Sequence, residues 1–456
     1  MPRPGIPSRW LARNPTLRNN PAVTSEPYDV LIIGCGPGGS SAATFLARAG
    51  QRVLVLEKEV FPRFHIGESL LPCNMTIFRE MGVLPALQAA GFPRKFGARF
   101  ELGNGTLSTR FAFRQGKYNR EPEAIQVERA VFDHVLLKHA RATGADVREG
   151  WTVQQFATTA DGVTLDATAP DGKTHQFRAA YLIDASGRGN LTGNQEGLRV
   201  IHPSHRKLAV FAHYTGVKRA EGEAGNDIII VRLDNKWFWI IPIGPNKTSV
   251  GLVIDAADFA RAKGTPQEIL EQHIASTPPV KERMAAASRV SEIHTTSDFS
   301  YFNRRLVGER LLRVGDAAGF MDPIFSAGVF LAMWSGKIAA ETLCQAITTG
   351  QPGGRRFARY EKRVRHSINQ YWRMVENYYT TPFMELFLRP SEHANLFSAV
   401  IALLAGEFEG SWALRWRIEY FFLLVKIQAR WPMSPRISFA PRRLNPALPS
   451  PVSTPS

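Results

Sequence analysis

Three glycines near the start of the sequence have the spacing of a phosphate-binding turn. They are Gly34, Gly36 and Gly39 in the stretch GCGPGG. In a G-x-G-x-x-G turn the first glycine allows a tight bend, the second lets the backbone approach a pyrophosphate, and the third packs a helix closely against a strand. Glu57 lies 23 positions after Gly34, where a carboxylate can bind a ribose hydroxyl. These residues predict a site for a dinucleotide.

The segments around this turn predict a β–α–β unit that presents it. Residues 28–33 (YDVLII) and 51–57 (QRVLVLE) are apolar runs typical of buried parallel strands. Between them, residues 40–50 are small enough for a helix to pack closely on a sheet, with its free N–H groups facing the phosphates. Residues 180–188 and 311–319 predict two more buried strands, so we expect an α/β fold.

The middle of the chain predicts strands, and the end predicts helices. Between residues 200 and 300 the runs NDIIIVRL and KTSVGLVI are strand-like. After residue 330 apolar residues recur every three or four positions, which is typical of a helix packed on one face. These residues are Phe357, Tyr360, Val364, Ile368 and Tyr371. Such a stripe indicates packing and assigns no function.

The composition excludes several classes of protein. The net charge is +16, from 56 Lys and Arg against 40 Asp and Glu, and half of the excess lies in Pro-rich tails at the two ends. No zinc pattern, basic helix or aromatic RNA-binding motif accompanies this charge, so we expect no nucleic-acid partner. Cys35, Cys73 and Cys344 match no metal or redox spacing, which indicates a reducing, cytoplasmic location and no metal site. No apolar run approaches about 18 residues, so we expect no membrane span.

Four motifs together resemble one large superfamily. GCGPGG, RVLVLEK, QVERAVFDHVL and VGDAAGFMDP look like the flavoprotein monooxygenases, over residues 27–345. The resemblance implies a Rossmann-like domain that binds FAD. Arg129 would lie along the flavin or its pyrophosphate, and Asp316 would hold the ribityl chain. The alternative for Arg129 is a structural ion pair with Asp133.

The stretch FPRFHIGESLLP, directly after the second strand, narrows the resemblance. PRFHIGES is similar to the corresponding segment of the flavin-dependent halogenases, although reductases of isoprenoid lipids have a related sequence at this place. In the halogenases Arg63 and the loop of Gly67, Glu68 and Ser69 would pack beside the isoalloxazine ring.

Two further motifs favour the halogenases over the reductases. NKWFWIIPIG matches their W-x-W-x-I-P signature at Trp237, Trp239, Ile241 and Pro242. Alternation on a strand places both tryptophans on one face, where the resemblance implies that they separate the flavin from the substrate. FMDPIFSAG matches F-x-x-P-x-x-S-x-G, and backbone amides before a helix suit an anion such as chloride. Its residues are Phe320, Pro323 and Ser326, with Ala327 and Gly328 supplying the halide-binding amides. The alternatives are an aromatic core strand and an ordinary FAD-contacting loop.

The stretch GFPRKFGARF also resembles the halogenases, and the resemblance implies that Lys95 is the catalytic lysine. A buried lysine often has a lowered pKa, and its amine could hydrogen-bond hypohalous acid or be halogenated by it. The alternative is a solvated basic pair, Arg94 and Lys95.

The resemblance implies a reaction and its partners. A separate NAD(P)H-dependent flavin reductase would supply reduced FAD, and oxygen would then oxidise chloride or bromide to hypohalous acid. Lys95 would deliver this to an electron-rich aromatic ring. The rival interpretations are a flavin monooxygenase or geranylgeranyl-reductase-like enzyme of the same fold, and a non-catalytic flavin-binding protein.

The substrate is expected to be a phenol or a pyrrole. Halogenases of free tryptophan carry a glutamate just before the S-x-G serine, where this chain has Phe325. The sequence resembles instead the group that acts on phenols, pyrroles and acyl groups bound to an acyl or peptidyl carrier protein, so tryptophan is disfavoured.

Six segments are expected along the chain. They are a disordered basic tail (1–26), the first part of the FAD-binding domain (27–200, with a substrate-domain excursion near 95–120), a β-rich substrate domain (201–305), a return to the FAD-binding domain (306–345), a helical C-terminal cap (346–430) and a Pro-rich disordered tail (431–456). Within the cap, residues 412–427 (WALRWRIEYFFLLVKI) could cover the substrate cavity, form a membrane or carrier-protein surface, or complete the core.

Overall fold

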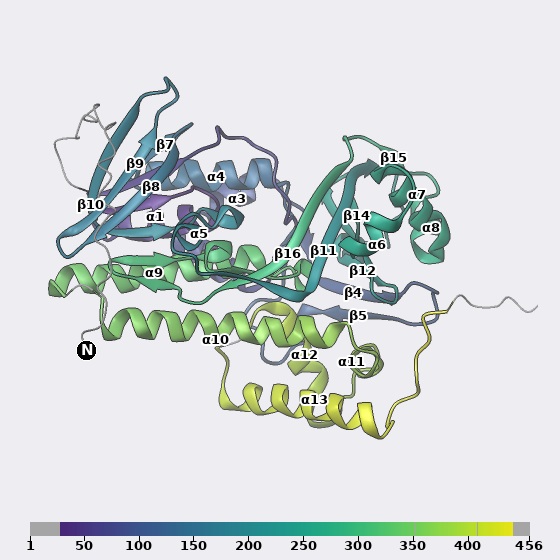
Figure 1. The fold of residues 1–456 in the computed structure, drawn as a ribbon. Coiled ribbons are helices and arrows are strands. Elements are labelled where there is room, and N and C mark those ends of the chain that lie inside the picture. The colour runs from purple at the N-terminus through teal and green to yellow at the C-terminus, as the bar shows by residue number, and fades with distance from the viewer. Residues whose placement is uncertain (1–27, 352, 408, 441–456) are drawn as a thin grey trace, which may run out of the picture.

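The computed structural model describes residues 28–351, 353–407 and 409–440. The expected tail at residues 1–26, and the tail beyond residue 440, lie outside this range. Two sheets stand side by side and share a layer of long helices (Figure 1). In the part of the chain that the structure describes, no helix is both long and apolar enough to cross a membrane.

The first sheet contains the β–α–β unit that the glycine turn predicts. Its main path runs β17-β18-β10-β1-β2-β7. The pairs β10–β18, β1–β10, β1–β2 and β2–β7 are all parallel, so their carboxyl ends meet at one edge. The strands are β1 (Tyr28–Ile33), β2 (Val53–Glu57), β7 (Asp146–Glu149), β10 (Thr174–Asp184), β17 (Val307–Gly308) and β18 (Leu311–Arg313), with the antiparallel hairpin β8 (Thr152–Thr159) and β9 (Gly162–Thr168) at the side.

The second sheet has the order β19-β16-β11-β14-β13-β12-β4-β5, with β15 paired to β11. Its strands are β4 (Gly97–Leu102), β5 (Ser108–Ala112), β11 (Arg199–Thr215), β12 (Ile228–Arg232), β13 (Trp237–Gly244), β14 (Lys247–Asp255), β15 (Ser288–Arg289), β16 (His294–Asn303) and β19 (Gly319–Phe320). Strand β4 pairs in parallel with β12 and antiparallel with β5, so residues 97–112 belong to the second sheet although they precede most of its strands in the chain. A separate antiparallel pair, β3 (Arg94–Lys95) and β6 (Ala124–Ile125), carries Lys95.

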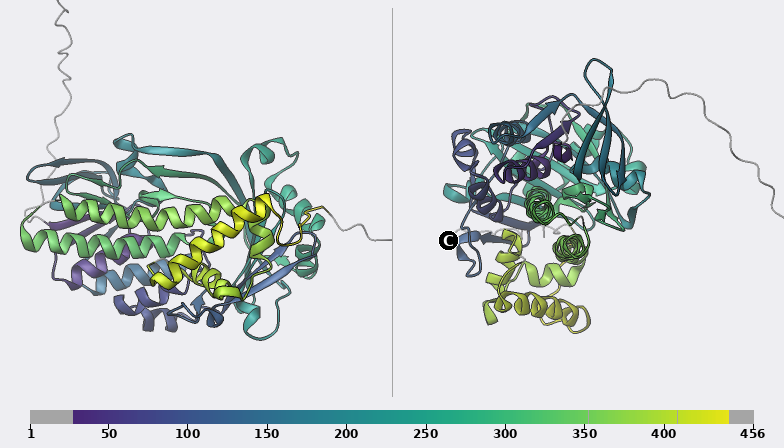
Figure 2. Two further views of the ribbon diagram at one scale, coloured as in Figure 1. Left: turned by 90° about the horizontal axis from the view of Figure 1, so that it is seen from below. Right: turned by 90° about the vertical axis from the view of Figure 1, so that its left-hand side faces the viewer.

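Helices cover the sheets in layers. Helices α9 and α10 lie side by side beneath the first sheet, and α11–α13 form a further layer (Figures 1 and 2). The N-terminal helices are α1 (Pro37–Arg48), α2 (Cys73–Met81), α3 (Leu84–Ala89), α4 (Arg129–Ala142) and α5 (Leu191–Gln195). The others are α6 (Ala256–Arg261), α7 (Pro266–Ser276), α8 (Pro278–Met284), α9 (Gly328–Thr349), α10 (Arg355–Tyr378), α11 (Thr381–Phe387), α12 (Leu396–Ala405) and α13 (Trp412–Arg430).

The predicted helix stripe is confirmed on α10. Phe357, Tyr360, Val364, Ile368 and Tyr371 are all buried, because α10 turns this face toward α9 and the first sheet. The strand predicted to run into Gly315 and Asp316 is β18. Strand β18 ends at Arg313, because Gly315 adopts a positive φ of 56° and starts a single helical turn.

Residues 431–440, where a disordered tail was expected to begin, are held against the fold. The Asn104 side chain donates to the carbonyl oxygens of Ser438 and Ala440 at 2.7 and 3.0 Å. The Ile437 N–H donates to the buried Glu385 carboxylate at 3.1 Å. Residues 431–440 therefore pack on the fold and are not part of a disordered tail.

Candidate active site and cofactor cavity

A cavity of about 940 Å³ lies between the two sheets and the start of α9. This volume is at the upper end of the range for cofactor sites. Seventeen of the predicted site residues line it, and the three that do not are Gly39, Lys95 and Pro242. The fold thus brings four motifs that are distant in sequence to one wall.

The glycine turn leaves open space where the pyrophosphate was predicted. A Cβ atom added at Gly39 would lie 1.9 Å from the Gly34 carbonyl oxygen. A Cβ added at Gly34 would lie 2.6 Å from the Ala185 carbonyl oxygen, so both glycines serve close packing. At Gly36 the nearest atom would be an Arg63 nitrogen at 3.8 Å. Gly36 also caps the N-terminus of α1, where unpaired N–H groups suit an anion.

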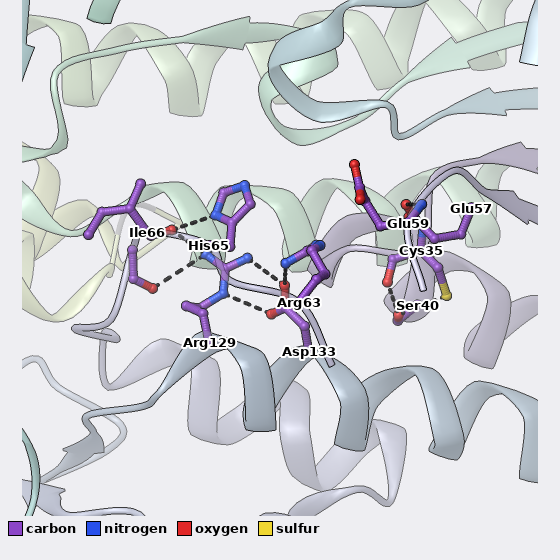
Figure 3. Close-up of polar contacts among 10 residues, drawn as sticks. Cys35, Ser40, Glu57, Glu59, Arg63, His65, Ile66, Arg129 and Asp133 are labelled. Carbon is purple, nitrogen blue, oxygen red and sulfur yellow. Dashed lines mark hydrogen bonds and ion pairs between the residues drawn. The ribbon is translucent and has the colours of Figure 1, made fainter. Parts of the chain in front are cut away.

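Glu57 stands at the end of β2 with its carboxylate fixed by the backbone. Oε2 accepts a hydrogen bond from the Cys35 N–H at 2.6 Å, and Oε1 accepts one from the Glu59 N–H at 2.9 Å (Figure 3). Each oxygen keeps a second lone pair, so the group can still accept from a ribose hydroxyl in the cavity.

Arg129 and Arg63 share one buried carboxylate, that of Asp133 (Figure 3). Arg129 donates to both oxygens of Asp133 at 2.8 Å, and Arg63 donates to one of them at 2.8 Å. Burial alone would raise the pKa of Asp133, but the two guanidinium groups lower it below its ordinary value. The ion pair weighed as an alternative for Arg129 is present, and both arginines also line the cavity.

Arg129 also fixes the loop that carries Glu68 and Ser69. Its Nη1 donates to the carbonyl oxygen of Ile66 at 2.7 Å. Gly67 has a φ of 105°, and a Cβ there would lie 2.9 Å from the same Nη1. The loop therefore needs glycine at this position and faces the cavity with the two residues that follow.

Lys95 lies behind the cavity wall and reaches it through Ser69. Its side chain is 1% exposed, and Nζ donates to Ser69 Oγ and to the Leu70 carbonyl oxygen, both at 2.9 Å. Burial lowers the pKa of Lys95 to about 7, although the negative charge of Asp227 acts in the opposite direction and raises it. Arg94 is exposed and pairs with Glu123, so the alternative of a solvated basic pair fails for Lys95.

The two tryptophans of β13 lie on the face that lines the cavity, as alternation predicts. Their ring centroids are 5.9 Å apart. Trp239 Nε1 donates to Ser249 Oγ at 3.0 Å, and Trp237 Nε1 donates to Tyr379 Oη at 2.9 Å. Tyr379 in turn donates to the buried Asp322 carboxylate at 2.7 Å. No local motif indicates that Tyr379, after α10, supports Trp237.

Replacing Tyr379 by phenylalanine tests this support. The variant leaves Trp237 Nε1 without its acceptor and Asp322 Oδ2 without its donor, both in buried surroundings. We expect a loss of about 1–3 kcal/mol in the free energy of unfolding, measured by urea denaturation. Tyr420→Phe, on the half-buried face of α13, is the control, and an equal loss there would contradict the role of Tyr379.

The turn between β19 and α9 presents backbone to the cavity. Asp322 Oδ1 accepts from the Ile324 N–H at 3.1 Å, and Ser326 has a positive φ of 58°. A Cβ added at Gly328 would meet no atom within 4 Å, and Ala327 and Gly328 both line the cavity. This geometry is compatible with the predicted halide site. Phe325 points away into the core, with its ring centroid 5.6 Å from that of Tyr378.

The residues present fit an FAD molecule. The cavity offers a pyrophosphate cradle at Gly36, a carboxylate for ribose at Glu57 and a half-buried carboxyl, Asp316, whose pKa is raised to about 6 by burial. When bound and reduced, FAD supplies the electrons with which oxygen oxidises a halide to hypohalous acid. Among the described C-terminal helices, α10 contributes Val364 and Ile368 to the wall, whereas α11–α13 contribute no residue.

Comparisons with known proteins agree with this geometry. The FAD binding domain family matches residues 27–375. The chain is 30% identical to a 1H-pyrrole-2-carbonyl peptidyl-carrier-protein chlorinase of Pseudomonas fluorescens, over 78% of this chain and 84% of that protein. It is 34% identical to a tryptophan 2-halogenase of Chondromyces crocatus, over 71% of this chain and 62% of that protein.

A solved structure extends the likeness to the whole fold. The flavin-dependent brominase Bmp2 has 30% sequence identity and a TM-score of 0.80, covering 89% of this chain and 100% of that one. The prediction of an α/β fold with a Rossmann-like FAD-binding domain is confirmed. The chain belongs to the FAD binding domain family and, within it, to the flavin-dependent halogenases, enzymes that use FAD and a halide to halogenate an aromatic substrate.

Proposed function

We propose that this enzyme halogenates a pyrrole or phenol ring carried on an acyl or peptidyl carrier protein, and that Lys95 directs the halogen. The observation that carries the proposal is the buried Lys95 amine, whose hydrogen bond to Ser69 connects it to the FAD cavity. Phe325 stands where the halogenases of free tryptophan carry a glutamate, and because it packs in the core, position 325 supplies no carboxylate to the cavity. The pyrrole-carrier chlorinase supports the same substrate class, whereas the tryptophan 2-halogenase marks the competing one.

Each group of cavity residues has a role in the proposed reaction. The amides of Ala327 and Gly328 hold the halide, and Trp237 and Trp239 keep the ring away from the flavin. The neutral Lys95 amine takes the halogen from hypohalous acid and releases water. The halogen then passes to a ring carbon, and the ring proton returns to the amine. A separate flavin reductase supplies reduced FAD.

A substrate comparison tests the proposal. Photoreduced, FAD-loaded enzyme is mixed with oxygen, bromide and one of four rings: carrier-bound pyrrole, free pyrrole-2-carboxylate, a simple phenol or tryptophan. We expect carrier-bound pyrrole to react fastest, by at least about tenfold, with the phenol next. Tryptophan as the fastest substrate would overturn the substrate assignment.

The pKa of Lys95 predicts a pH dependence of halogen delivery. The neutral amine can accept the halogen and the ammonium cannot, so the active form increases as pH rises through about 7. The quantity to measure is the fraction of hypohalous acid that ends on the ring rather than on an added scavenger, monochlorodimedone. We expect this fraction to rise between pH 6 and pH 8. A fraction that falls over this range would assign the role to the ammonium instead.

A further inference from the structure

Glu68 is a buried cavity carboxylate with only one oxygen bound. Its side chain is 2% exposed, and Oε1 lies 2.8 Å from Nε2 of His213. Oε2 is buried and has no hydrogen-bond partner. In the part of the chain that the structure describes, it is the only such side-chain oxygen or nitrogen on the cavity wall. Oε2 lies just behind the cavity surface, and a buried carboxylate oxygen without a donor is costly, so a rotation of the carboxyl group that exposes this oxygen to the cavity is favoured.

The other cavity carboxylates are already occupied or less buried. Glu57 accepts from two backbone N–H groups, and Asp322 accepts from Tyr379 and from the Ile324 N–H. Asp316 is half-buried in the part of the wall assigned to the ribityl chain. Glu68 alone combines full burial with an open oxygen and a titratable partner.

His213 continues from Glu68 toward the surface. It is buried on β11, and its ring centroid lies 6.2 Å from that of Phe64. The half-buried His294 of β16 also contacts Phe64, with ring centroids 4.2 Å apart. Phe64 is 47% exposed, so this cluster borders solvent. From the cavity to the surface, the titratable groups therefore follow in the order Glu68, the buried His213 and the half-buried His294.

The halogenation reaction requires a proton inside the cavity. Reduced FAD (FADH2), oxygen, one halide and one proton give FAD, hypohalous acid and water. Without halide oxidation, FADH2 and oxygen give FAD and hydrogen peroxide, and no proton is consumed. Proton supply therefore separates the two outcomes, and transfer of the halogen to the ring has no further net proton requirement.

We propose that Glu68 and His213 form a proton-transfer pair that donates, through the Glu68 carboxyl group, the proton consumed when halide is oxidised in the cavity. The inference rests on the proposed halogenase function but not on the role of Lys95. A proton passes from His213 to Glu68 along the 2.8 Å contact between Nε2 and Oε1. Rotation of the carboxyl group brings the protonated oxygen to the cavity, and His213 is protonated again from solvent past His294.

The test follows hypohalous acid rather than ring product alone. FAD-loaded protein is photoreduced and mixed with oxygen, bromide, pyrrole substrate and monochlorodimedone. Total hypohalous acid is the sum of brominated ring and brominated scavenger, and hydrogen peroxide is measured beside it. The variants are Glu68→Gln, Glu68→Ala and His213→Gln, with Glu292→Gln as the control because its exposed side chain lies near His294. The FAD dissociation constant is determined for each.

We expect Glu68→Gln to lower total hypohalous acid about 100-fold, with hydrogen peroxide in its place and the FAD dissociation constant within about twofold of wild type. Added formate should restore hypohalous acid in Glu68→Ala, because a small acid can replace the missing donor. Unchanged hypohalous acid, absence of formate rescue, or a loss that follows weakened FAD binding would each overturn the proposal.

Two further comparisons keep the result decisive. Lys95→Ala should move bromine from ring to scavenger, whereas Glu68→Gln should lower both products, so failure of the lysine assignment is distinguishable from failure of this one. If the Glu68 variants do not fold, His213→Gln decides: we expect at least about a tenfold loss of total hypohalous acid. An unchanged total in that variant would refute the pair.

Discussion

Replacing Lys95 by alanine is expected to lower the rate of ring halogenation at least about 100-fold while leaving FAD affinity unchanged. Lys95 contacts Ser69 and Leu70 and does not line the FAD cavity itself, so its loss removes the amine without opening the cofactor site. The measurement is single-turnover formation of brominated pyrrole, with FAD binding followed by absorbance.

The adjacent arginine gives a matched control for Lys95. Arg94→Ala removes a cation one position earlier on the same strand, but its side chain is exposed and pairs with Glu123. We expect Arg94→Ala to retain at least about half of the wild-type rate. Equal losses in the two variants would mean that general positive charge, rather than the buried amine, accounts for the effect.

Replacing Gly39 by alanine is expected to destabilise the FAD-binding domain by about 3 kcal/mol or more. The added Cβ would lie 1.9 Å from the Gly34 carbonyl oxygen, and Gly34 cannot move away because it packs on Ala185. Thermal unfolding of the FAD-free protein measures this loss.

Gly36→Ala is the companion variant, because it separates packing from binding. Its Cβ would face open space, 3.8 Å from the nearest Arg63 nitrogen. We expect a free energy of unfolding within about 0.5 kcal/mol of the wild-type value. FAD binding should weaken at least about tenfold, since the methyl group would stand where the pyrophosphate approaches. If Gly36→Ala binds FAD normally, the pyrophosphate does not lie at this turn.

Features carried by a local pattern were predictable from sequence. Strand β1, the glycine turn, α1 and β2 follow one another within residues 28–57, so short-range spacing defines them. The same holds for the alternating tryptophans of β13 and for the buried stripe of α10. Family resemblance supplied the candidate roles of Lys95 and of the turn before α9, which spacing alone does not give.

Features that depend on tertiary contacts were not predictable. Glu68 and His213 are 145 positions apart and meet only because β11 passes beside the loop after β2. Tyr379 reaches Trp237 and Asp322 only because α10 ends beside the second sheet. The aromatic residues of 412–427 likewise suggested a cover over the substrate cavity. In the structure α13 packs on α11 and α12 and does not line the cavity.

The mass of the ring product tests the central claim most directly. Photoreduced, FAD-loaded wild-type enzyme is mixed with oxygenated buffer, bromide and carrier-bound pyrrole, and the released ring is analysed by mass spectrometry. We predict a ring in which bromine replaces hydrogen, recognisable by its paired isotope pattern, and no such product when bromide is omitted. A ring that gains oxygen instead, with or without bromide, would contradict halogenation and identify the enzyme as a monooxygenase.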